Sequence, residues 1–140
     1  MSQPSEFIIV KHDAIKRGLH NDLRFKKPSG NMWISFSVRD QIPLVPGKKI
    51  VIIETTEHTR EEALFIGKIE SGYGAGTIEK YDKGACEIIS CSNKHIKIIF
   101  HGSKIKGLYH IINTSTFGKG DKNSKTWLFF KASTQENNNE

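Results

Sequence analysis

The sequence predicts an all-β domain, folded as a compact closed or partly closed β-barrel with little helix. Its apolar runs are short and rich in Ile, Val, Phe and Trp, and turn residues interrupt them at intervals of roughly 8 to 15 residues, which is typical of sandwiches and barrels. Helical periodicity is nearly absent, and only residues 59–63 are expected to form one short helical turn. An apolar content of 36% in 140 residues is enough for one core.

Strands are predicted wherever β-branched and aromatic residues gather between turns. In chain order they cover residues 7–10, 19–25, 32–38, 49–54 and 63–69, and then residues 76–81, 85–89, 95–101, 108–114 and 126–131. Residues 28–31, 43–47, 82–84 and 118–124 carry Gly, Pro, Asn or Asp and are expected to be turns. Residues 133–140 are polar, so we expect a single domain over residues 1–132 and a disordered tail after it.

The charge balance favours an anionic partner. Lys and Arg total 21 against 15 Asp and Glu, which gives a formal net charge of +6. The lysines are scattered along the chain, however, and a basic surface without a specific partner fits the composition equally well.

The cysteines and the chain start indicate a soluble, intracellular protein. Cys86 and Cys91 make no disulfide framework and are expected to be reduced thiols. There is neither an apolar run of about 18 residues, as a membrane span requires, nor a signal peptide. We therefore predict a cytoplasmic protein without a membrane partner.

The segment from residue 19 to residue 25 alternates in a way that gathers three functional groups. In a strand, side chains two apart share a face, so His20, Asp22 and Arg24 point one way and the apolar side chains of Leu19, Leu23 and Phe25 point to the core. An imidazole, a carboxylate and a guanidinium in one row suit a metal plus an oxyanion. The alternative is an ordinary amphipathic strand with a solvent-exposed polar face.

His12 is the candidate for a further metal ligand. It lies at the end of the preceding strand, and residues 14–18 would turn the chain back toward His20. Two imidazoles and one carboxylate are a common ligand set for a first-row divalent ion, with open positions for water and a phosphate oxygen.

Three further segments contain candidate functional residues. His58, in the loop segment 54–58, is placed to donate a proton or hold a phosphate, although a solvated surface residue is the alternative. Residues 72–77 match no phosphate-binding loop and are expected to be a structural bend. Residues 101–110 predict a hairpin turn with lysines at its tip, either solvated or in contact with a nucleic-acid backbone, and His95 and His110 are expected to be structural.

Taken in order, six segments resemble the 3′-phosphoesterase domain family of bacterial DNA ligase D and its stand-alone archaeal and bacterial relatives. They are residues 7–14, 19–24 with the His-x-Asp-x-Arg pattern, 57–58, 72–77, 101–107 and 127–131. The resemblance implies a compact barrel and a hydrolase for DNA repair, which trims a 3′-terminal ribonucleotide to a 3′-phosphate and then removes that phosphate. It implies Mn²⁺ as the cofactor, with Zn²⁺ or another first-row ion as alternatives.

By position, the resemblance carries His12, His20 and Asp22 over as metal ligands. Arg24 and His58 carry over as the groups that bind the scissile phosphate and stabilise its developing charge. The implied partners are DNA or RNA-containing DNA 3′ ends and a separate DNA ligase or polymerase, and the chain is expected to be a monomer.

The chain also departs from the family pattern. Thr56 stands where the family usually has Glu, with Glu57 or Glu54 as replacements only if the backbone shifts, and Glu62 stands where the family has Tyr. The family's Lys after the Trp-containing strand falls near residues 39–40, and the connection from His12 to His20 is two residues longer than usual. These departures favour, as an alternative function, a catalytically weakened module that binds nucleic-acid ends. An unrelated metal-binding domain for a small phosphorylated metabolite is a third hypothesis.

Overall fold

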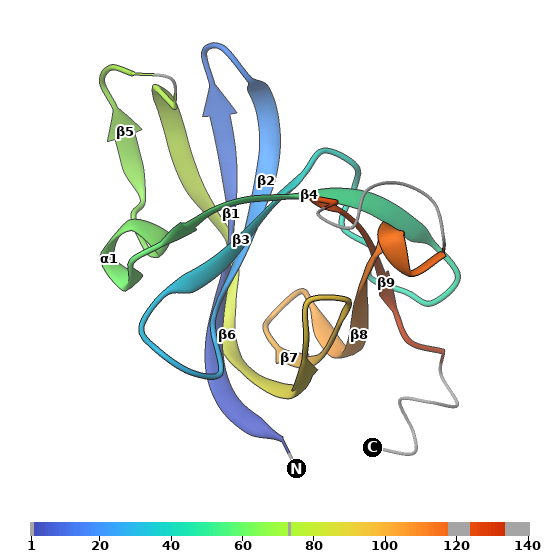
Figure 1. Cartoon of the computed structure of the whole chain (residues 1–140). Coiled ribbons are helices and arrows are strands. Elements are labelled where there is room, and N and C mark those ends of the chain that lie inside the picture. Colours follow the sequence, from blue (N-terminus) through green and yellow to red (C-terminus); the bar gives the residue numbers. More distant parts are fainter. Residues whose placement is uncertain (1, 73, 118–123, 134–140) are drawn as a thin grey trace.

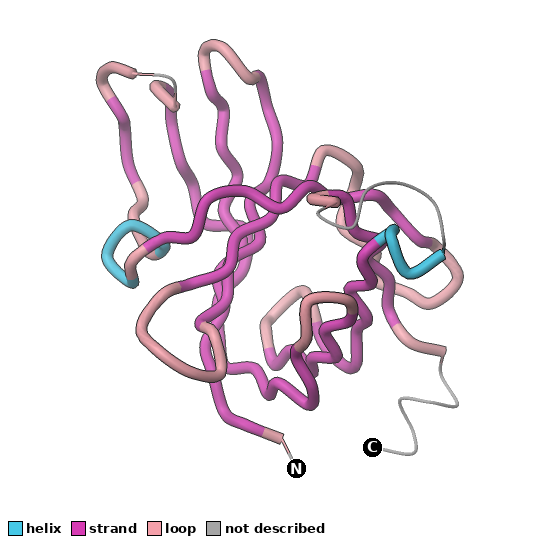
Figure 2. Tube along the Cα trace, viewed as in Figure 1, coloured by secondary structure: helices cyan, strands magenta, loops and turns pink. Residues whose placement is uncertain are grey.

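The computed structural model describes residues 2–72, 74–117 and 124–133, which are almost entirely strands (Figures 1 and 2). The elements are β1 (Gln3–Ala14), β2 (Gly18–Lys26), β3 (Trp33–Val38), β4 (Lys49–His58), α1 (Arg60–Ala63), β5 (Gly67–Ile69), β6 (Gly76–Cys91), β7 (His95–His101), β8 (Lys106–Asn113), the 3₁₀ turn η1 (Thr114–Phe117) and β9 (Thr126–Lys131). Of the predicted turn at residues 118–124 and the predicted tail at residues 133–140, all but residues 124 and 133 lie outside the described residues.

Antiparallel pairing closes the sheet into a barrel. The described strands follow the order β1-β2-β3-β4-β9-β8-β7-β6-β5, and β1 also pairs with β6. This additional pairing closes eight strands into a ring and leaves β5 as an extra strand along the start of β6. The predicted all-β barrel is therefore confirmed, and it is fully closed.

Large aromatic side chains fill the barrel interior. Phe100 makes edge-to-face contacts with Phe7 and Tyr109, at 4.9 and 5.3 Å between ring centroids. The Tyr109 hydroxyl, buried with its ring, donates a hydrogen bond to the carbonyl oxygen of Pro43 at 2.6 Å. Because side chains pack the interior, the barrel is a core and its chemistry has to lie outside it.

A second, smaller apolar cluster lies on the outer face of β1. Along β1, Phe7 and Ile9 belong to the interior core, whereas Ile8 and Val10 belong to the outer cluster with Trp33, Ala63 and Ile78. The α1 turn and β5 contribute side chains to this outer cluster, and in Figure 1 β5 stands beside the projecting end of β6, with α1 below it.

The prediction of a turn at residues 82–84 is wrong, because β6 runs through them as one strand. The register with β1 shifts between the pairs Ile9↔Asp82 and Val10↔Lys80, so Tyr81 is the extra residue of a β-bulge. Glycine at position 84 is explained by a close approach of two backbones and not by a turn, because a Cβ there would lie 2.8 Å from the carbonyl oxygen of His101.

The prediction of a strand over residues 63–69 is also wrong in its first half. Residues 60–63 form α1, which confirms the helical turn expected at residues 59–63, and only residues 67–69 are a strand. Thr59 and Glu62 form a capping box that starts this turn. Leu19, predicted to face the core, is 57% exposed because the β1–β2 hairpin extends beyond the barrel.

Two further observations bear on the sequence predictions. Cys86 and Cys91 are both free thiols, as expected. No helix among the described residues has the length and apolar character needed to cross a membrane.

Candidate functional site

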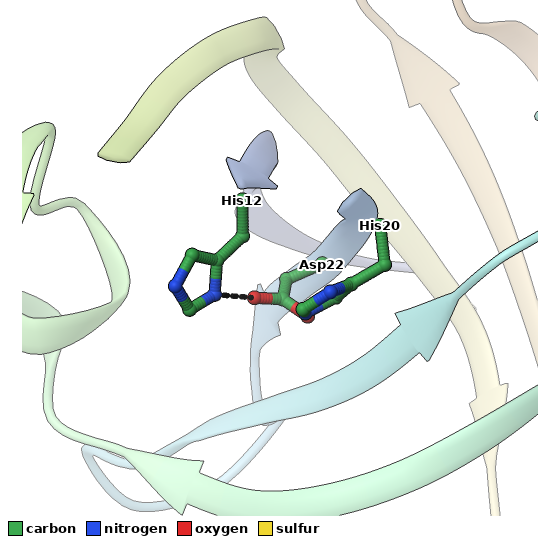
Figure 3. Close-up of side chains that lie close together, drawn as sticks. All are labelled: His12, His20 and Asp22. Atoms are coloured by element: carbon green, nitrogen blue, oxygen red, sulfur yellow. Dashed lines mark ion pairs between the residues drawn. The ribbon is translucent and has the colours of Figure 1, made fainter. Parts of the chain in front are cut away.

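The pairing of β1 with β2 places the predicted metal ligands side by side. In this register His12 lies opposite His20, and Val10 lies opposite Asp22, so all these side chains share the outer face of the barrel wall. One ligand atom from each of His12, His20 and Asp22 lies within 4.8 Å of the other two. Figure 3 shows these three side chains close together. The three residues are only 3% to 7% exposed, which excludes the alternative of a solvent-exposed polar face.

Backbone carbonyls fix the tautomer of each imidazole in its neutral form. His12 Nε2 donates to the carbonyl oxygen of Gly74 at 2.9 Å, and His20 Nδ1 donates to that of Gly18 at 3.1 Å. A carbonyl only accepts, so the neutral rings carry their hydrogens on these nitrogens. The other nitrogens then direct lone pairs at Asp22, with His12 Nδ1 3.6 Å and His20 Nε2 3.3 Å from its carboxylate oxygens.

This donor set fits a divalent metal ion. The two nitrogen lone pairs and the carboxylate oxygens repel one another unless protons or a shared cation lie between them. Among the described residues, His20 Nε2, Arg24 Nε and Ser35 Oγ are buried site atoms without a hydrogen-bond partner. Each such atom costs about 1–3 kcal/mol, so the arrangement is more favourable with a ligand bound. Nitrogen and oxygen donors of this kind suit first-row divalent ions.

Asp22 is negatively charged at neutral pH. Burial acts to raise the pKa of the carboxyl group, but the contact with His20 and the positive charge of Arg24 outweigh it and hold the pKa below its usual value. The carboxylate is therefore available as a ligand at any pH at which the protein is expected to work.

Arg24 is held between this carboxylate and the end of α1. Its Nη2 donates to Asp22 Oδ2 at 3.1 Å, and its Nη1 donates to the carbonyl oxygens of Glu62 and Ala63 at 3.3 and 3.1 Å. Burial lowers the pKa of the guanidinium and the contact with Asp22 raises it, and the group stays charged. Arg24 thus presents a fixed positive charge beside the three candidate ligands.

His58 belongs to the same site and is not a solvated loop residue. It ends β4 opposite Trp33, its side chain is 28% exposed, and its Nδ1 lies 3.8 Å from Glu62 Oε1. Burial first and the nearby Arg24 second lower its pKa, against a smaller opposite effect of Glu62 and Asp22. The imidazole is therefore mostly neutral near pH 7 and offers one N–H donor and one acceptor.

One cavity of about 730 Å³ joins these groups. His12, Asp22, Arg24 and His58 all line it, while His20, whose side chain is fully buried, lies in the wall behind the lining. Such a volume falls in the range of small-molecule and cofactor pockets. All five predicted site residues are thus brought to one place.

The structure also settles which acidic side chains reach the cavity. Thr56 lines it, whereas Glu57 pairs with Lys27 at 2.9 Å and Glu54 accepts from Trp127 Nε1 at 3.1 Å, both along a separate groove. Neither therefore replaces the carboxylate that the family has at Thr56. Besides Asp22, the carboxylates that line the cavity come from Glu61 and Glu62 of α1.

Several contributors to the site were not identified from the sequence. Arg17 lines the cavity and donates to Ser37 Oγ at 3.2 Å, and the buried Ser35 hydroxyl lines it as well. The carbonyl oxygen of Gly74 orients His12, so the glycine segment at residues 72–77 is more than a bend. The pattern Thr59-x-x-Glu62 was the one available signal, since it marks the start of a helix.

The turn at residues 101–107 has a structural role. The buried carboxylate of Asp82 accepts hydrogen bonds from the backbone N–H groups of Ser103, Lys104 and Ile105, as well as from that of Lys83. His95 and His110, whose rings contact each other at 2.8 Å on β7 and β8, are not among the residues that line the cavity. The contact between His95 and His110 agrees with the structural role predicted for these two residues.

The fold and the site together define a class of protein: a small antiparallel β-barrel with two imidazoles, a carboxylate and a guanidinium gathered on its outer wall. Residues 10–113 match the sequence profile described as the DNA Ligase D 3′-phosphoesterase domain. The chain belongs to this 3′-phosphoesterase domain family.

Curated relatives agree with this assignment. The chain is 31% identical over 94% of its length to the multifunctional non-homologous end joining protein LigD of Mycolicibacterium smegmatis, of which it covers 17%. It is 29% identical over 93% of its length to the protein of the same name from Pseudomonas aeruginosa, of which it covers 15%. The chain therefore spans less than a fifth of the length of these relatives.

Proposed function

We propose that this protein is a metal-dependent phosphoesterase that processes the 3′ ends of DNA, as a 3′-ribonucleoside phosphodiesterase, a 3′-phosphomonoesterase or both. Family membership supports the reaction class, and the names of the relatives support a role in DNA repair by non-homologous end joining. The observation that carries the proposal is the pair of imidazoles whose tautomers are set by backbone carbonyls, with the free nitrogens facing Asp22.

In this proposal His12, His20 and Asp22 hold the metal ion. A bound divalent ion supplies Lewis-acid polarisation of a phosphate oxygen and an acidified water. Mn²⁺ is proposed as this ion, with Zn²⁺ or another first-row ion as the alternatives, since the same ligands serve several of them.

Arg24 and His58 act on the phosphate itself. The guanidinium, fixed by Asp22 and the carbonyls of α1, gives a permanent positive charge that offsets the charge growing on the phosphate oxygens. His58, half-buried on the same cavity, donates a hydrogen bond to a phosphate oxygen in its neutral form, or a proton to the leaving oxygen in its protonated form. DNA or RNA-containing DNA 3′ ends are the proposed substrates, with a separate ligase or polymerase acting on the product.

A second candidate function is a DNA-end-binding module with weakened catalysis. The observation in its favour is Thr56, which lines the cavity at the position of the family's Glu, while Glu54 and Glu57 face elsewhere. A site that lacks a carboxylate needed for turnover can keep its affinity for metal and phosphate.

A turnover assay separates the two functions. The purified protein is incubated with and without Mn²⁺ with a primer-template that ends in one 3′-ribonucleotide, and with a matched one that ends in a 3′-phosphate. Metal-dependent shortening or phosphate release supports the enzyme. Tight binding of metal and DNA without any product supports the end-binding module.

A pair of histidine variants tests the assignment of the site. His20→Ala removes a proposed ligand, whereas His110→Ala removes an imidazole outside the cavity and serves as the control. We expect His20→Ala to lose Mn²⁺ binding, measured by calorimetry, together with turnover, and His110→Ala to keep both. Unchanged metal affinity in His20→Ala would reject the proposed ligand set.

A further inference from the structure

The cavity has an apolar wall that the chemistry of the phosphate does not use. Phe65, Ile69 and Ile78 line it in addition to the charged groups. Ile69 and Ile78 belong to the outer apolar cluster, but Phe65 remains 41% exposed. Inside a cavity, an exposed aromatic ring provides a surface that a flat apolar ligand can cover.

The Phe65 ring lies beside Gly67, shortly after the end of α1. Its backbone N–H donates to the carbonyl oxygen of Glu62 at 3.3 Å, directly after α1. The Cζ atom of the ring lies 3.3 Å from the position that a Cβ on Gly67 would take, and Gly67 has a φ of +145°. A residue with a side chain at position 67 would therefore crowd the ring as well as strain the backbone.

Charged and apolar groups share this cavity. Arg24 and His58, which attract a phosphate, line it together with Phe65 and with Glu61 and Glu62 of α1. Glu62 Oε1 lies 3.8 Å from His58 Nδ1, and these carboxylates disfavour a second phosphate in the cavity but do not oppose an uncharged ring. The Phe65 wall is thus suited to the neutral part of a ligand whose phosphate lies at Arg24.

We propose that Phe65 and Ile69 form a subsite for the nucleobase of the 3′-terminal nucleotide, which stacks on the Phe65 ring while its phosphate lies at Arg24 and His58. This inference rests on the proposed function and adds that the cavity binds the base of the substrate as well as its phosphate. Stacking on an aromatic ring is tolerant of base identity, because every base has a π-face. The subsite therefore positions any 3′-terminal nucleotide without selecting a sequence.

The test compares two DNA duplexes that differ only in whether the 3′-terminal deoxynucleotide carries a base or is abasic. Affinity is measured by fluorescence anisotropy in the presence of Mn²⁺ for the wild type, Phe65→Ala, Phe65→Trp and Phe117→Ala. Phe117 is the matched control, because it is 54% exposed and is not among the cavity-lining residues. Thermal melting of each variant verifies that it is folded.

We expect Phe65→Ala to bind the base-bearing duplex about 5- to 150-fold more weakly, which corresponds to ~1–3 kcal/mol of stacking at 1.4 kcal/mol per tenfold. Its affinity for the abasic duplex should not change, Phe65→Trp should restore base-dependent binding, and Phe117→Ala should match the wild type. Equal losses on both duplexes, no loss on either, or no binding of either duplex by the wild type would overturn the subsite.

The outcomes also distinguish this inference from the proposed function. If the wild type cleaves a 3′-ribonucleotide but Phe65→Ala shows no base-dependent loss, the function stands and the subsite is wrong. If no turnover occurs but the base-dependent loss is found, the subsite stands on an end-binding protein and the proposed enzyme is wrong.

Discussion

Replacement of Asp82 by Asn tests whether this carboxylate holds the turn between β7 and β8. Its Oδ1 accepts backbone N–H bonds from Lys83 and Ser103 at 2.8 and 3.0 Å, and its Oδ2 accepts from Lys104 and Ile105, both at 2.9 Å. An Asn side chain has one carbonyl oxygen and one NH₂ group, so two of the four N–H donors would face another donor.

The expected loss of stability follows from that count. A buried donor left without its partner costs about 1–3 kcal/mol, so Asp82→Asn should lower the free energy of unfolding by roughly 2–6 kcal/mol. Urea denaturation followed by tryptophan fluorescence measures this difference. A loss below about 1 kcal/mol would refute the role assigned to the carboxylate.

Acid titration provides a second measurement on the same residue. Burial acts to raise the pKa of Asp82, but the four backbone N–H donors outweigh it and hold the pKa below the ordinary value of 3.8. The stabilisation is therefore complete above the ordinary pKa and is lost as the pH falls through the lower pKa of the folded state. The difference in stability between wild type and Asp82→Asn should shrink over this acidic range, and a difference that stays constant would contradict the assignment.

Four further predictions concern the core and the site. Phe36→Ala, at a fully buried interior position, should cost about 3–5 kcal/mol of stability in urea denaturation. Gly76→Ala should destabilise the protein and weaken metal binding in calorimetry, because a Cβ there would collide with the carbonyl oxygen of Asp13 and the loop that orients His12 would shift. Arg24→Lys should lower metal affinity by about 10- to 100-fold, because it removes a group that orients the proposed ligand Asp22, and it should also raise KM. Unchanged values would show that Asp22 needs no orientation by Arg24. His58→Ala should reduce kcat by about 10²- to 10⁴-fold with Mn²⁺ affinity retained, and loss of metal instead would make it a ligand.

Sequence patterns were sufficient for the parts of the fold that depend on local chemistry. The strands at residues 95–101 and 126–131 were predicted with the bounds that the structure has, since apolar side chains and turn residues mark both ends. The error at residues 82–84 has a tertiary cause. Asp82 and Gly84 have the composition of a turn, yet one is selected for its hydrogen bonds to another segment and the other for a close backbone approach.

The candidate site likewise has a part that the sequence predicts and a part that depends on tertiary contacts. Strand alternation was enough to place His20, Asp22 and Arg24 on one face, and hairpin pairing brings His12 to them. The carbonyl oxygen of Gly74 could not be predicted, because a backbone atom leaves no signature in the sequence. Glu61 and Glu62 were out of reach as well, since their place at the cavity depends on how α1 packs against β4.

The pairing of His12 with His20 determines which length changes this hairpin tolerates. Because neighbouring residues of a strand face opposite sides of the barrel wall, a one-residue insertion inside β2 would exchange the two sides, with Phe25 turned outward and Arg24 turned into the core. Added residues are compatible with both faces where they enlarge the connection at residues 15–17 or lengthen both strands in step. In evolution or engineering, the tip of the β1–β2 hairpin is therefore the place where this domain can change its length while its proposed metal ligands stay aligned.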